Sequence, residues 1–111
     1  MRNIGSGRTA ATVVLVGLEN EEMGRVRETL AAEAVLPSNS TGFGDALTSI
    51  RRTRPDVVIV SFSQGIEAPL ALAQAVQREA VSSTLVALAD ASDAEHILAA
   101  MRVGYKEFVV L

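Results

Sequence analysis

The sequence lacks cysteine and tryptophan, and only 4% of its 111 residues are aromatic. Without cysteine the chain has neither disulfides nor thiolate metal sites, and its core must be built from aliphatic residues. Long hydrophobic runs are also absent, because the longest, such as 13–16 and 57–60, are far too short to span a bilayer. The N-terminal residues have no apolar stretch typical of a signal peptide. We therefore expect a cytoplasmic protein without membrane insertion.

Positive charge is scarce as well. Ten Lys and Arg residues against thirteen Asp and Glu residues give a formal net charge of −3. A general nucleic-acid-binding protein normally has a basic excess, so no nucleic-acid partner is expected. The hydrophobic share of 49% is typical of a folded chain, and 111 residues suit one compact domain. Residues 1–11, rich in Gly, Ser and Thr, are predicted to be a flexible leader before a domain at 12–111.

Short apolar runs alternate with helical patterns along the rest of the chain. The patterns predict strands at 12–18, 34–37, 57–62, 84–89 and 107–111, and helices at 20–30, 45–53, 67–80 and 92–102. Asn20 is suited to cap the first helix, Ser92 and Glu95 have the spacing of a capping box, and Gly104 is suited to end the last helix. Apolar strands that alternate with helices predict a doubly wound parallel sheet with helices on both faces.

Three segments resemble CheY-like response-regulator receiver domains. Residues 54–61 resemble the third receiver strand, which usually ends in the phosphorylated aspartate, and 84–89 resemble the fourth, which usually ends in Thr or Ser. Residues 101–111 resemble the segment that leads into the fifth strand, which usually ends in lysine. The resemblance implies a flavodoxin-like, five-stranded parallel sheet in the order 2-1-3-4-5, with the final helix missing. The Met-Arg-x-Gly-x-x-Glu-Phe phrase at 101–108 is similar to the atypical receiver domains of TadZ/CpaE-type pilus-assembly proteins.

The residues that a phosphorylatable receiver uses are all replaced. Receivers hold Mg²⁺ with an acidic pair, accept the phosphoryl group on aspartate, and bind its oxygens with a hydroxyl and a lysine. Taken in that order, the matching positions hold Gly17 and Leu18, Ser61, Ala89, and Leu111. The displaced acids Glu19 and Asp90 are the nearest substitutes. We therefore expect no enzymatic activity, no bound metal and no cofactor.

Other candidate groups have simpler structural explanations. Ser61 has no evident base to activate it as a nucleophile, and His96 is expected to be a partly exposed structural residue. The first-turn acids at 19, 21 and 22 are interpreted as solvated residues that favour the helix N-terminus rather than cation ligands. Gly42 and Gly44 resemble a fragment of a phosphate loop but lack its third glycine. Arginines 51, 52 and 54 are expected to stabilise a helix C-terminus.

The residues favour a pseudo-receiver, which is a signalling or protein-interaction module that works without aspartyl phosphorylation. It would form a homodimer or dock onto a downstream domain of the same polypeptide. Tyr105, Met101 and Arg102 are the predicted partner-binding residues, with Tyr105 as an exposed aromatic anchor. Without a final helix, apolar surface on the first, third and fifth strands is expected to be uncovered and to meet a partner. Two alternatives remain open: a phosphorelay receiver that uses Glu19 and Asp90, and a small flavodoxin-like nucleotide or cofactor binder.

Overall fold

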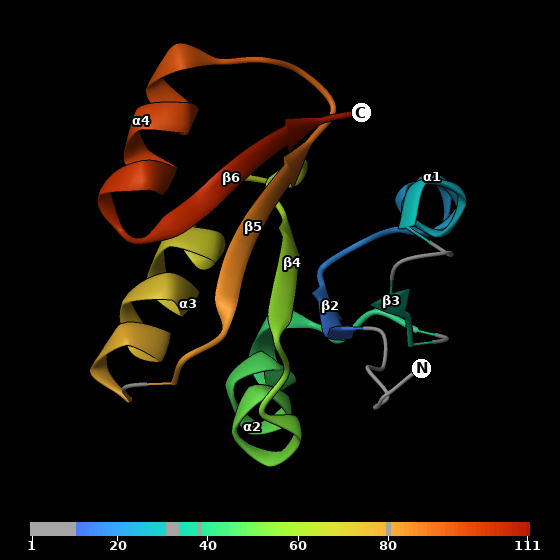
Figure 1. Ribbon diagram of the computed structural model, residues 1–111. Helices are drawn as coiled ribbons and strands as arrows, with labels where there is room; N and C mark the ends of the chain where they lie inside the picture. The colour runs from blue at the N-terminus through green and yellow to red at the C-terminus, as the bar shows by residue number, and fades with distance from the viewer. Residues whose placement is uncertain (1–10, 31–33, 38, 80) are drawn as a thin grey trace, which may run out of the picture.

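The structure is a computed structural model that describes residues 11–30, 34–37, 39–79 and 81–111. Most of the predicted leader lies outside these residues, but Ala11, which was assigned to it, is the first residue of a strand. The described residues form these helices and strands (Figure 1), in the order β2 (Ala11–Val16), α1 (Asn20–Leu30), β3 (Ala34–Val35), α2 (Phe43–Thr53), β4 (Val57–Ser61), α3 (Glu67–Arg78), β5 (Thr84–Ala89), α4 (Ala94–Arg102) and β6 (Tyr105–Val110).

The strands form one parallel sheet in the order β3-β2-β4-β5-β6. If the five strands are numbered from one in the order in which they occur along the described chain, their order in the sheet is 2-1-3-4-5. The register aligns Val16 with Val60 and Val60 with Ala87, so the carboxyl ends of the central strands meet at one edge of the sheet. The predicted class, an α/β fold of the flavodoxin-like and CheY type, is confirmed.

Helices cover both faces of the sheet, and each face has its own apolar core. On one face α2, α3 and α4 contribute buried residues that pack against Val14, Val58 and Ala87. On the other face α1 contributes Met23 and Val26. Figure 1 shows α1 on the opposite side of the sheet from α3 and α4. The aliphatic core expected from the scarcity of aromatic residues is present, and each Val or Leu that it buries contributes about 1.5–3 kcal/mol.

Some predicted boundaries are wrong by a few residues. The last strand begins at Tyr105, because its parallel pairing with β5 continues to Leu85 across a register shift. The capping residue of α4 is Asp93 rather than Ser92, since its side chain accepts hydrogen bonds from the N–H groups of Glu95 and His96. Gly104 follows α4 as predicted, with a φ of +112° that suits glycine.

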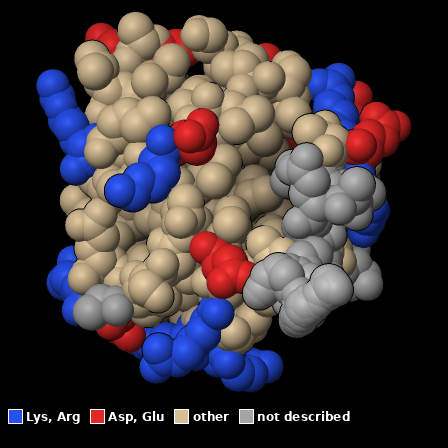
Figure 2. Space-filling model, viewed as in Figure 1, with Lys and Arg blue, Asp and Glu red and all other residues tan. Residues whose placement is uncertain are grey.

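The expectation of an uncovered sheet face is met only in part. Val13 and Leu15 of the first strand are buried beneath α1, so the expectation is wrong for this strand. Val57 and Val86 are half-buried, and Val109 is 40% exposed. Figure 2 shows that the middle of the face in view is mostly uncharged but carries a few charged side chains, among them a positive and a negative one side by side, and that positive side chains gather along its lower edge. No helix among the described residues is long and apolar enough to cross a membrane.

Candidate functional site

The positions that correspond to the receiver phosphorylation site lie together at the carboxyl edge of the sheet. Ser61 is the last residue of β4, Ala89 is the last residue of β5, and the backbone N–H of Leu111 donates to the Ala89 carbonyl at 2.9 Å. A hollow opens beside them, and its lining residues are Glu19, Glu21, Glu22, Arg25, Ser63, Asp90 and Leu111. The predicted acids Glu19 and Asp90 are therefore brought to one hollow with Leu111.

The Glu22 side chain, which comes from the first turn of α1, fills the inner part of this site. Its carboxylate oxygens both lie 3.0 Å from the Ser61 hydroxyl, and one of them accepts a hydrogen bond from the Ser63 hydroxyl at 2.8 Å. The backbone N–H of Glu19 donates to the other oxygen at 3.2 Å. Glu22 is only 9% exposed. The acceptor position of the site is thus occupied by a serine that is hydrogen-bonded to a buried carboxylate.

Two predictions about these residues are wrong. Glu22 is buried rather than solvated, and Ser61 does have an adjacent carboxylate. One local signal was available, because Glu22 stands three residues after Glu19, where a glutamate reaches back to the backbone N–H before a helix. The contact with Ser61 joins residues 39 positions apart, and no local pattern contains it.

The displaced acids are arranged differently from Glu22. Glu19 is exposed and accepts a hydrogen bond from the Gln64 side-chain amide at 2.7 Å, whereas Asp90 is exposed beside the same hollow. Among the described residues no group of three or more His, Asp or Glu side chains is arranged to hold a metal ion. At the lysine position Leu111 offers an aliphatic side chain, and Arg25 lies 3.9 Å from Glu21 on its own helix. The site therefore offers an aliphatic side chain where a receiver binds phosphoryl oxygens with a cation.

Tyr105 is not the exposed anchor that the sequence suggested. Its side chain is 2% exposed, its hydroxyl donates to the Pro69 carbonyl at 2.7 Å, and its ring meets that of Phe62 edge to face at 5.1 Å. Burial raises the pKa of this phenol far above its usual range. Phe108 is half-buried, and the centre of its ring lies 5.6 Å from that of the Phe62 ring in an edge-to-face arrangement.

The other two predicted partner-binding residues lie on the surface. Met101 is 43% exposed, and Arg102 is exposed beside it at the end of α4. Leu98, one turn earlier, is 55% exposed. The large hydrophobic side chains that are exposed in the described part of the chain all belong to α4 or β6: Leu98, Met101, Val109 and Val110. Such side chains contribute to binding when a partner covers them.

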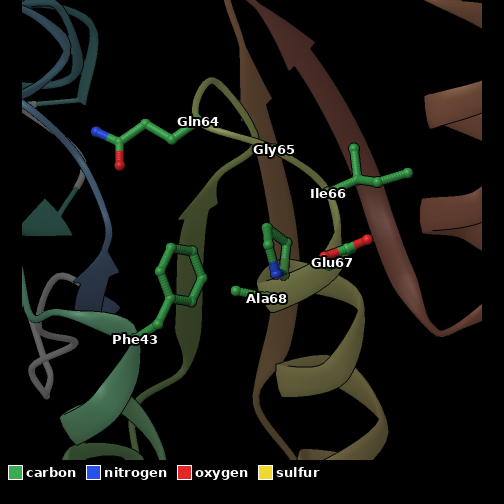
Figure 3. A pocket seen from close by; sticks show the side chains of 7 residues that line it. Phe43, Gln64, Gly65, Ile66, Glu67 and Ala68 are labelled. Carbon is green, nitrogen blue, oxygen red and sulfur yellow. The ribbon is translucent and has the colours of Figure 1, made fainter.

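A second hollow lies between the N-terminal ends of α2 and α3, where Phe43 faces Ala68 (Figure 3), and Pro69 also lines it. Gly42 precedes α2 with an extended backbone, so the Gly42–Gly44 segment begins a helix. The Phe43 ring covers Gly17, and a Cβ atom on Gly17 would lie only 2.5 Å from Cε2 of that ring. The packing of Phe43 against Gly17, in the loop after β2, accounts for the Gly42–Gly44 segment without a phosphate ligand.

The remaining candidates have ordinary structural contacts. His96 lies 3.9 Å from Asp93, the residue that caps its own helix. Arg51 binds both carboxylate oxygens of Glu79 and so links the C-terminal ends of α2 and α3. This ion pair raises the pKa of the Arg51 guanidinium and lowers the pKa of the Glu79 carboxyl. Arg54 ends α2 in the left-handed conformation, with its N–H bonded to the Ile50 carbonyl.

The fold is that of the receiver domains of response regulators. No family model matches the sequence, and no curated protein matches it. Solved structures do match. The chemotaxis protein CheY4 from Vibrio cholerae is 19% identical, with a TM-score of 0.75 over 92% of this chain and 87% of that chain. At this level of identity the likeness establishes the fold alone.

Two further solved structures match over 88% of this chain. The CheY-like protein TadZ from Pseudomonas aeruginosa is 25% identical, with a TM-score of 0.70 over 88% of this chain and 84% of that chain. A pilus assembly-related protein from Burkholderia pseudomallei is 12% identical, with a TM-score of 0.74 over 88% of this chain and 75% of that chain. The predicted resemblance to CheY-like receivers, TadZ included, is confirmed.

Proposed function

We propose that this chain is a pseudo-receiver, a protein-interaction module that works without aspartyl phosphorylation and without enzymatic activity. The observation that carries the proposal is the contact between Ser61 and Glu22 at the acceptor position. A serine hydroxyl that donates to a buried carboxylate takes the place of the free carboxylate that would attack a phosphodonor. The replacement of lysine by Leu111 supports the same conclusion, because transferred phosphoryl groups need cationic partners.

The proposal is tested by incubating the protein with Mg²⁺ and acetyl phosphate and measuring its intact mass. We expect no added phosphoryl group. A stoichiometric, hydroxylamine-labile phosphorylation would refute the proposal. If that adduct disappeared in Glu19→Gln or Asp90→Asn, the protein would be the alternative, a phosphorelay receiver with a displaced acidic site. A stabilising effect of FMN or a nucleotide would favour the other alternative, a flavodoxin-like cofactor binder.

We propose the exposed apolar side chains of α4 as the interaction surface. Leu98 and Met101 are three residues apart and therefore lie on one side of the helix, with Arg102 beside them. The partner is a second copy of this chain or another domain of its polypeptide. The neighbouring structures support a role in two-component signalling or pilus assembly, and we place the protein in the cytoplasm.

Charged substitutions at this surface separate binding from folding. We expect Leu98→Asp and Met101→Asp to weaken self-association in sedimentation experiments, while the unfolding midpoint stays close to that of the unmodified protein. Gln74→Asp, at an exposed position of α3, is the matched control. If sedimentation is unchanged in both α4 variants, α4 does not carry the self-interaction.

A further inference from the structure

We propose that Glu22 is a built-in ligand for an oxyanion site, and that this site accepts a small carboxylate monoanion when the Glu22 side chain is absent. The inference rests on the proposed function, because it assumes that no phosphoryl group enters this edge of the sheet. It assigns a ligand class to the residues around Ser61.

Three donors from different segments converge on one anion. The Ser61 hydroxyl comes from the end of β4, the Ser63 hydroxyl from the loop after it, and the Glu19 N–H from the loop before α1. The Ser63 N–H also donates to the Ser61 oxygen at 3.2 Å, so that the Ser61 hydroxyl hydrogen is directed at the carboxylate. Hydrogen bonds to an ionised acceptor are about twice as strong as neutral ones. This geometry is that of an anion-binding site whose anion is part of the chain.

The charges around the site favour a ligand with a single negative charge. Glu19, Glu21 and Asp90 line the same hollow, and Arg25 is the cation among the lining residues. A phosphate dianion would add two negative charges to this acidic surrounding, whereas formate or acetate would restore the single charge that Glu22 supplies. We therefore expect the donors to favour a monocarboxylate over phosphate.

Chemical rescue tests this assignment. In Glu22→Ala the side chain is shortened, and the donors around it are left without their acceptor. We expect the unfolding temperature in sodium chloride to fall by roughly 5–10 °C, because the buried Ser61 hydroxyl loses its charged acceptor and the partly buried hydrogen bonds from Ser63 and Glu19 are lost with it. Sodium formate at equal ionic strength should then raise it again by about 4–8 °C, and sodium phosphate should raise it less.

Matched variants distinguish rescue from a general salt effect. Glu21→Ala removes a neighbouring first-turn carboxylate whose side chain is 85% exposed, so formate and chloride should give the same unfolding temperature. Glu22→Gln keeps the side-chain volume and should also be insensitive to formate. Adding Ser63→Ala to Glu22→Ala removes one donor and should reduce the formate effect.

Each outcome decides the proposal. A formate effect confined to Glu22→Ala and reduced by Ser63→Ala supports the oxyanion site. If Glu22→Ala is destabilised and formate does not restore it, or if it does not fold in either salt, Glu22 is only a structural residue and the proposal is wrong. If Glu22→Ala is as stable as the unmodified protein, the donors do not hold the carboxylate and the proposal also fails. Phosphorylation of the unmodified protein by acetyl phosphate is a separate result that would overturn the proposed function.

Discussion

Replacing Tyr105 with phenylalanine removes one oxygen atom from the core and tests whether this residue serves packing or binding. The hydroxyl donates to the Pro69 carbonyl at 2.7 Å, and the side chain is 2% exposed. Tyr105→Phe keeps the ring against Phe62 but leaves the Pro69 carbonyl without this donor. We expect a loss of about 1–2 kcal/mol in the free energy of unfolding. Tyr105→Ala also removes the ring and should cost about 3–5 kcal/mol.

Urea unfolding followed by far-ultraviolet circular dichroism measures both variants. Thermal unfolding of the same variants gives a second measurement, because in a domain of this size a loss of 1 kcal/mol lowers the unfolding temperature by roughly 4–8 °C. Lys106→Ala changes the exposed neighbouring residue and should alter stability by less than about 0.5 kcal/mol. If Tyr105→Phe unfolds at the same urea concentration as the unmodified protein, the hydroxyl is not bonded in the core.

Three further predictions concern the Tyr105 phenol, Gly17 and the cap of α4. Since burial raises the pKa of the Tyr105 phenol, the unfolded chain loses this proton first. The contribution of the neutral Tyr105 phenol to the free energy of unfolding should therefore be complete below about pH 10, the ordinary phenol pKa, and should decline above it. Urea titrations at alkaline pH should show a weaker decline for Tyr105→Phe. Gly17→Ala places a Cβ against the Phe43 ring at a φ of +74° and should cost about 2 kcal/mol or more in urea unfolding; an unchanged midpoint would contradict the packing described. Asp93→Ala removes the cap of α4 and should cost about 1 kcal/mol, whereas Ser92→Ala should be nearly neutral in the same assay.

The fold was predictable because it depends on patterns that are local in the sequence. The apolar run at 57–60 predicts a strand that is buried on both faces, and the structure confirms it as β4. The short strand β3 was predicted too long, because only its first two residues pair with β2. An edge strand ends where its pairing with the neighbouring strand ends, and the composition of the segment does not show that point.

The candidate site was predictable only as a set of replaced positions. That Ser61, Ala89 and Leu111 lie together follows from the parallel order of the strands and needs no side-chain information. The partner of Ser61 could not be predicted in this way. Glu22 looks like an ordinary first-turn acid, and only the tertiary packing of α1 turns its carboxylate inward. The same limit applies to Tyr105, whose hydrogen-bond partner is 36 residues away.

The contact between Glu22 and Ser61 also restricts how this site could regain phosphorylation. An aspartate at position 61 would place a second carboxylate about 3 Å from that of Glu22, the distance of the present hydrogen bonds. Two carboxylates this close do not both stay ionised, so one must hold a proton or move away. Unless a cation lies between the two carboxylates, an aspartate at position 61 would therefore be a poor phosphoryl acceptor. Electrostatics couples position 61 to position 22, so an acceptor at 61 requires either a bound cation or a change at Glu22.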